Sequence, residues 1–259
     1  MLPFLKFNEV EILAFALVLL RVSAFTVSWP VFSVYNVPNI SKILFAVLLS
    51  MVMFPIIDRT GLTAQGLGNE VVWLAGREVL TGLCLGFLTR LFFFAVSAGA
   101  NLIATSAGLA NAQLFNPTMG ASTTTVEQFY AVIATLLFLA ANGHHMFLTG
   151  LAESFQAIPL GPAGIDIAVF KESGELIQAV VEAGIKMSAP VLVAIFVMNV
   201  AMGIIGRAVP QINVLVTSMP VNFMTGIVVM LISIPALVLQ LDHDIVEFAD
   251  MMFRFMRAM

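Results

Sequence analysis

The sequence predicts an all-α integral membrane protein of about six long helices, partly broken or kinked and arranged as helical hairpins. Composition is the first observation behind this prediction, because 60% of the 259 residues are hydrophobic and only 10% are charged. The surface of a soluble domain needs about 25–35% charged residues, and the mean hydropathy of +1.04 excludes such a surface here. The second observation is a series of six apolar runs, separated by segments rich in Gly, Pro, Asn and Asp.

The six runs are compared with the roughly 20 residues that cross about 30 Å of hydrocarbon. The second run is several residues too short and the third is far too long. This mismatch predicts tilted, bent or broken helices, or helices covered by partner proteins more than by lipid. Prolines in the last part of the chain are expected to kink it. The runs are Val10 to Phe32, Ile43 to Ile57, Val71 to Ala107, Val126 to Leu151, Leu176 to Ile205 and Val214 to Leu241, and the prolines are Pro190, Pro210, Pro220 and Pro235.

Charge and cysteine content argue against a nucleic-acid-binding protein, a cleaved signal peptide and an internal disulfide. The net charge of -4 is spread along the chain, which leaves no nucleic-acid footprint. Glu9 and Glu11 precede the first run and Arg21 interrupts it, so we expect that run to stay as structure and not to act as a cleaved signal peptide. The single cysteine, Cys84, can form no internal disulfide. The distribution of lysine and arginine favours cytoplasmic termini.

A polar but uncharged segment, Ala107 to Thr125, lies between the third and fourth runs. Asn116, Pro117 and Gly120 make it unfit for lipid, because each unpaired backbone group costs several kcal/mol in hydrocarbon. One interpretation places this segment in a protein-lined cavity at membrane depth, as a filter, a gate or a plug. The other is a short, weakly polar loop on the far side of the membrane.

Ionisable residues in or beside the apolar runs need partners, because a charge facing lipid costs at least about 2.5 kcal/mol at mid-bilayer. Glu182 and Lys186 have the spacing and order of an intrahelical ion pair, and mutual neutralisation is the simplest interpretation. Neighbouring Arg77 and Glu78 point in different directions around a helix, so each is expected to have a separate partner. The full set is Arg21, Arg77, Glu78, Arg90, Glu182, Lys186 and Arg207.

Glu78, Gly82, Gly86 and Arg90 recur at every fourth residue and form one stripe on a helix. Gly82 and Gly86 make a GxxxG step, which lets another backbone approach closely. The stripe is therefore predicted to be a helix packing face with a charged group at each end. A proton relay uses the same residue types and remains the alternative.

No catalytic constellation is present, and we expect neither an enzyme nor a cofactor. The sequence has no GxSxG elbow, no HExxH and no Gly-rich phosphate loop ending in Lys. His144 and His145 follow Asn142 and Gly143, which is typical of a polar helix end. Adjacent histidines without a further ligand at helical spacing do not predict a metal site.

The C-terminal segment, residues 242–259, predicts an amphipathic helix with acidic residues first and arginines last, in agreement with the helix dipole. Such a helix lies on a membrane surface or docks against a partner subunit. Its net negative charge favours the partner.

Several motifs together resemble the FliR family of flagellar export-gate proteins and its SctT relatives in virulence injectisomes. The hallmark region is SAPVLVAIFVMNVAMGIIGRAVPQINVLVTSMPVNFMTGI, Ser188 to Ile227. Three further stretches agree in order and spacing: Glu78 to Phe87, Ala98 to Gly120 and Leu137 to Gly161. Two departures are Asn116, where the family commonly has Asp, and Asn142, where Gly is usual.

This resemblance implies one domain, residues 1–259, that acts as a subunit of a hetero-oligomeric type III secretion export gate. It further implies FliP-like and FliQ-like gate subunits and a FlhB-like switch protein as partners, and unfolded flagellar proteins as substrates. The location implied is the bacterial inner membrane, at the flagellar basal body. A plug loop in the channel is also implied, and its matching residues are Gly108, Asn111, Gln113, Phe115, Asn116, Pro117, Met119 and Gly120.

Two other functions remain open. One is a small-solute or proton-coupled transporter, in which the segment from Asn111 to Gly120 binds substrate and Glu78 or Glu182 carries protons. The other is a structural assembly factor around which partner subunits nucleate.

Overall fold

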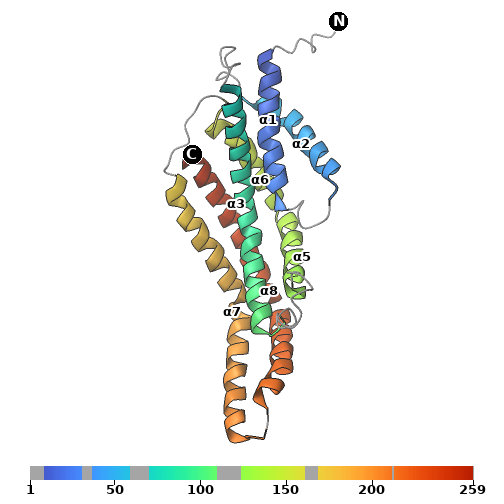
Figure 1. Ribbon diagram of the computed structural model, residues 1–259, viewed down its shortest axis with the longest axis vertical. Helices are drawn as coiled ribbons and strands as arrows, with labels where there is room; N and C mark the ends of the chain where they lie inside the picture. The colour runs from blue at the N-terminus through green and yellow to red at the C-terminus, as the bar shows by residue number, and fades with distance from the viewer. Residues whose placement is uncertain are drawn as a thin grey trace. The chain divides into compact units, whose positions relative to one another are not determined.

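The computed structural model describes residues 9–30, 37–58, 70–109, 124–160, 169–211 and 213–258 (Figure 1). Every regular element in these ranges is helical, which confirms the predicted all-α class. The elements are α1 (Glu9–Ser28), α2 (Asn39–Met53), the 3-10 helix η3 (Phe54–Ile56), α3 (Glu70–Ser106), α5 (Thr125–Ala140), α6 (Gly143–Ala157), α7 (Val169–Ala208) and α8 (Val214–Ala258).

The helices cover the six predicted apolar runs, with two differences: the fourth run is divided between α5 and α6, and the predicted C-terminal helix of residues 242–259 continues the sixth run as the end of α8. Among the described residues, five helices are long and apolar enough to cross a membrane, or up to six if the bent pair of α5 and α6 counts as one span. These two helices meet at an angle of 67°. The break lies at Asn142, whose backbone is left-handed with φ 56° and ψ 24°, so the predicted helix end at this position is confirmed. Glycine pays no steric penalty in this conformation, and asparagine is one of the few other residues that adopt it routinely.

The longest helices exceed one membrane crossing. The third run forms one continuous helix, α3, of 37 residues, and α7 and α8 have 40 and 45 residues. At 1.5 Å per residue these lengths are about 55, 60 and 67 Å. Pro190 lies inside α7, Pro220 and Pro235 lie inside α8, and Pro210 follows the end of α7.

The chain divides into two compact units, and α3, α7 and α8 each contribute to both. The first unit consists of Met1–Leu91, Asn142–Leu176 and Val246–Met259, and the second of Phe92–Ala141 and Ile177–Ile245.

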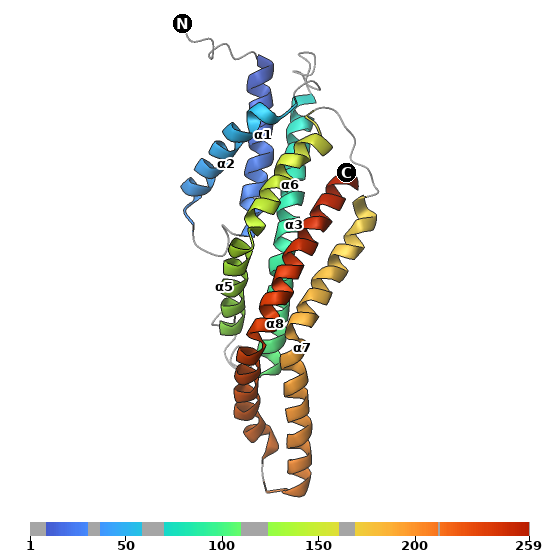
Figure 2. The same ribbon diagram turned by 180° about the vertical axis from the view of Figure 1, so that it is seen from behind.

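In the first unit, α1 packs beside α2 (Figure 1) and has eight buried residues. On its other side lies the first part of α3. Figure 2 shows α6 running beside the C-terminal part of α8. The apolar face of that C-terminal part, including Phe248 and Met252, is buried within this unit. The chain itself covers this face, so its burial requires neither a membrane surface nor a partner subunit.

The second unit contains the last part of α3, α5, and most of α7 and α8. Its core includes a cluster of aromatic rings, in which Phe92 and Phe138 have their centroids 6.1 Å apart. Helices α3 and α7 approach closely at Gly99 and Gly184: a Cβ atom added to Gly99 would lie 2.8 Å from the Gly184 carbonyl oxygen. By contrast, only 17% of the residues in the 18-residue apolar stretch of α7 that could cross a membrane are buried. Much of this helix is therefore available to lipid or to other proteins.

Candidate functional site

A buried charge cluster, formed by Arg21, Arg77 and Glu78, joins α1 to α3 in the first unit. Arg21 Nε donates to Glu78 Oε2 at 2.6 Å, and Arg77 Nη2 donates to Glu78 Oε1 at 3.0 Å. All three side chains are at most 3% exposed. Each of the two adjacent residues has a separate partner, Arg21 for Glu78 and the Pro159 carbonyl for Arg77. The sequence did not indicate that they also contact each other and share one ion-pair network.

Backbone carbonyls at the C-terminal end of α6 complete this cluster. Arg21 Nη1 and Nη2 donate to the carbonyl oxygens of Ser154 and Ile158, each at 2.9 Å, and Arg77 Nη2 donates to that of Pro159 at 2.7 Å. The Ser154 carbonyl also accepts from the Ile158 N–H, and the carbonyls at the end of a helix carry a partial negative charge. They therefore offset the excess positive charge left by two arginines and one glutamate.

The cluster favours a structural role over proton transfer. Both Glu78 oxygens accept hydrogen bonds from arginines. The Arg21 guanidinium also lies 4.1 Å from the centre of the Phe155 ring, a cation–π contact that keeps the site dry on that side. A proton carrier needs an oxygen that water or a second acid can reach, and the described surroundings of Glu78 offer neither.

Gly82 and Gly86 bring α3 against α1, and their neighbour is thus a helix of the same unit. A Cβ atom added to Gly82 would lie 2.9 Å from the Ala24 Cβ and closer still to the Arg21 carbonyl oxygen. One added to Gly86 would lie 2.9 Å from the Phe25 carbonyl oxygen and closer still to the Ser28 Cβ.

Arg90, the last member of the predicted stripe, is exposed, whereas Glu78 is buried. A spacing of four residues turns about 40° per step in a helix of 3.6 residues per turn. Three steps therefore rotate Arg90 about 120° away from Glu78. The face of α3 that packs against α1 includes Gly82 and Gly86 but not Arg90.

The remaining predicted charges lie on α7. Lys186 Nζ and Glu182 Oε1 are 2.7 Å apart, in the expected pairing, and about half of each side chain is exposed (49% and 52%). Arg207 lies in the last turn of α7 and is exposed. Neither position belongs to the buried charge cluster.

The predicted plug residues lie outside the described residues, except Gly108. Gly108 has a φ of 78° and ends α3 in a Schellman motif, in which the Leu109 N–H donates to the Ala104 carbonyl and the Gly108 N–H to the Thr105 carbonyl. The C-terminal end of the segment, at Thr124, is also held by a capping hydrogen bond.

Thr124 caps the start of α5 by accepting from the Glu127 N–H at 3.2 Å. The sequence pattern Thr124-x-x-Glu127 is that of a capping box, a signal that sequence analysis missed. Here the Glu127 side chain instead accepts a hydrogen bond from the Ser97 hydroxyl on α3. This contact ties α5 to α3 within the second unit.

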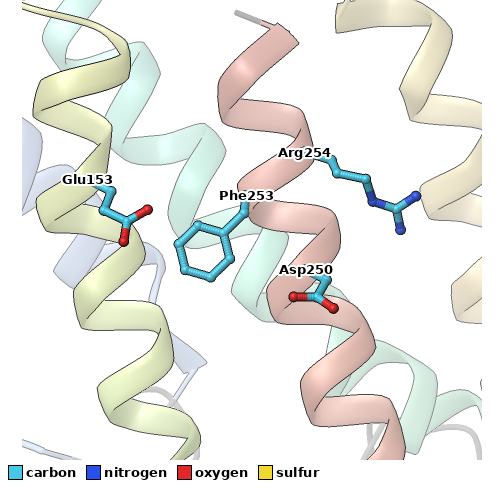
Figure 3. Close-up of a pocket in the computed structure, with 4 residues that line it drawn as sticks. All are labelled: Glu153, Asp250, Phe253 and Arg254. Atoms are coloured by element: carbon cyan, nitrogen blue, oxygen red, sulfur yellow. The ribbon is translucent and has the colours of Figure 1, made fainter.

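An open hollow of about 440 Å³ lies between α6 and the end of α8 (Figure 3). Its lining residues are Glu153, Asp250, Phe253 and Arg254, and we call it the acidic hollow. Glu153 and Phe253 extend toward each other from the two helices, whereas Arg254 points to the opposite side of α8. No sequence pattern predicts this hollow, because α6 and α8 come together only in the folded chain.

Comparison with known proteins gives a consistent result. A family model described as bacterial export proteins, family 1, matches residues 12–248. The chain is 32% identical over 222 residues to the flagellar biosynthetic protein FliR of Bacillus subtilis, with 85% of each chain covered. It is 28% identical to FliR of Caulobacter vibrioides, covering 85% of this chain and 87% of that protein. It is 27% identical to FliR of Aquifex aeolicus, with 88% of each covered.

Proposed function

Because the chain belongs to the bacterial export proteins of family 1, the FliR family, we propose that it is a subunit of the type III secretion export gate and forms part of the membrane portal for unfolded flagellar proteins. Its place is the bacterial inner membrane, at the flagellar basal body. The role is one of passage and not of catalysis.

The exposed apolar surface of α7 is the observation that carries this proposal. Large apolar side chains are exposed from Ile177 to Ile205, 29 residues that rise about 42 Å along the helix. To fit within about 30 Å of hydrocarbon, a straight helix would have to tilt by roughly 44°, beyond the usual range of about 0–40°. The exposed apolar face of α7 is thus longer than lipid alone would cover, and contact with other proteins accounts for it better.

The partners that would cover α7 and α8 are FliP-like and FliQ-like gate subunits, with a FlhB-like switch protein beside them. Support comes from the polar pair within this exposed region: Asn222 Nδ2 on α8 donates to Asn199 Oδ1 on α7 at 2.8 Å. An exposed amide pair among apolar side chains is poorly suited to hydrocarbon. It is well suited to a protein interface or a wet channel.

The segment from Ala107 to Thr125 is the proposed plug. Its two ends are held by local backbone geometry, the Schellman motif at Gly108 and the cap at Thr124. A neutral, polar segment between fixed ends has no strong charge that would trap a passing polypeptide. This property suits a closure that yields to many unrelated substrates.

The transporter alternative is less well supported. Glu78 is held between Arg21 and Arg77 with both oxygens occupied. Glu182 forms an exposed pair with the lysine one turn away. Each acidic residue therefore has a partner that explains its place without proton transport.

Secretion in a deletion strain tests the proposed function. Deleting the gene should abolish motility and the appearance of hook and filament proteins in the medium, and a plasmid copy should restore both. Membrane extracts of the restored strain should yield the tagged chain together with FliP-like and FliQ-like subunits. A deletion strain that still secretes these proteins contradicts the proposal.

A further inference from the structure

The acidic hollow is a feature that gate function does not explain. Glu153 and Asp250 are exposed on α6 and α8, and the half-buried ring of Phe253 lies between them (Figure 3). Within the described part of the chain, neither carboxylate has a hydrogen bond or an ion pair. Arg254 also lines the hollow, but its side chain points to the opposite side of α8. Two carboxylates beside an aromatic ring favour a cation, through charge and through the negative face of the ring.

The hollow continues along α6. A second hollow of about 180 Å³ shares Glu153 and Phe253 and adds Gln156, Ala157 and Met256. Its lining mixes a polar amide with small and apolar side chains. The surface therefore offers a place for a cationic group and, beside it, a place for an apolar one.

We propose that the acidic hollow binds a lysine or arginine side chain from a basic, amphipathic segment of a partner protein. The cationic group lies between Glu153 and Asp250 over the Phe253 ring, and a neighbouring apolar side chain occupies the second hollow. The site is a contact between resident subunits.

Charge and position favour a protein over a lipid surface. The apolar face of this part of α8 is already buried against the chain, so it is not free to enter a bilayer. From Val214 to Leu241, α8 has no charged residue, whereas Asp242, Asp244, Glu247 and Asp250 follow within nine positions. This acidic end repels the anionic headgroups that attract interfacial helices. A basic segment of a protein has the complementary charge.

Site-specific photo-crosslinking in the assembled complex tests this inference. The photo-reactive residue p-benzoylphenylalanine replaces Gln156, which lines the second hollow and leaves both carboxylates in place. After irradiation of cells, we expect a crosslink to another polypeptide, and mass spectrometry should map it to a segment with Lys or Arg beside apolar residues. The variant Glu153→Gln with Asp250→Asn should lower the yield about tenfold, equivalent to a loss of about 1.4 kcal/mol.

A matched variant, Glu9→Gln with Asp242→Asn, removes two exposed carboxylates outside the hollow and should leave the yield unchanged. The inference is overturned by a crosslink to lipid, to the chain itself or to a segment without basic residues, or by equal yields in the two double variants. Absence of a crosslink also overturns it if the same probe at exposed Val72 does crosslink. The inference rests on the proposed function only in that the chain works within a complex. A strain that secretes normally without this crosslink contradicts the inference alone.

Discussion

Arg21 on α1 and Glu78 on α3, 57 residues apart in the chain, form a charge-assisted hydrogen bond of 2.6 Å in a fully buried site. The same guanidinium donates to two carbonyls at the end of α6. One side chain thus connects three helices. Its geometry makes the stability of the first unit dependent on a balance of buried charges.

Replacing Glu78 with Gln should destabilise the protein more than replacing Arg21 with Met. The first change leaves two buried arginines without a carboxylate, at a cost of about 3–5 kcal/mol. The second keeps the pair of Arg77 and Glu78 and removes the arginine donor from the Ile158 carbonyl, at about 1–3 kcal/mol. Thermal unfolding of the purified protein measures both, with exposed Glu9→Gln as control. The reverse order would show that the carbonyl contacts outweigh the charge balance.

Alanine at Gly82 should destabilise the protein, whereas alanine at Gly76 should be neutral or stabilising. A Cβ atom at Gly82 meets the backbone of α1, while one at Gly76 meets nothing within 4 Å. In open space, Gly→Ala in a helix gains about 0.5–1 kcal/mol. Unfolding midpoints compare the two variants, and leucine at Gly82 should also lower recovery of partner subunits. Equal midpoints would mean that α1 and α3 separate without cost.

Replacing Asn142 with Gly should preserve the stability of the protein, whereas replacing it with Ala should lower it. Its φ of 56° lies in the left-handed region, where an ordinary L-residue pays roughly 1–2 kcal/mol, glycine pays almost nothing and asparagine pays little. We expect Asn142→Gly to unfold at or above the wild-type temperature and Asn142→Ala below it. If the alanine variant is as stable as the glycine variant, the break between α5 and α6 does not require this conformation.

Lys186→Ala alone should impair secretion more than Glu182→Gln combined with Lys186→Met. Removing only the lysine leaves an unpaired carboxylate on the apolar surface of α7, whereas the double change leaves no unpaired charge. Motility and the amount of secreted filament protein compare the variants at equal expression. A double variant that assembles but does not secrete would mean that the Glu182 carboxylate itself is needed, as a proton carrier would require.

A short deletion between Asn111 and Gly120 should leave the complex assembled but leaky. The proposed closure is steric, and the helices on either side begin and end through their own capping contacts. Conductance across the membrane and growth inhibition on expression both report a leak. An assembled deletion complex without any leak would contradict the plug assignment.

Local sequence was sufficient for much of the fold. Apolar runs predicted the helices, and the polar residues around Asn142 predicted a helix end that the structure confirms. The pair of Glu182 and Lys186 was also predictable, because residues four apart meet on any helix. The contact of Gly99 with Gly184 was not, since single glycines in apolar runs are common and only packing shows which of them face a neighbour.

The sequence by itself determined the membrane class, the helical character of the apolar runs and the pairs within one helix, because these depend on composition and on a spacing of 3.6 residues per turn. Only the tertiary structure decided that Arg21 meets Glu78, that Arg77 shares this carboxylate, and that the acidic hollow lies between α6 and α8. These contacts depend on the rotation and register of helices distant in the chain. Many such arrangements bury similar apolar area, and side-chain packing together with the pairing of buried charges selects one.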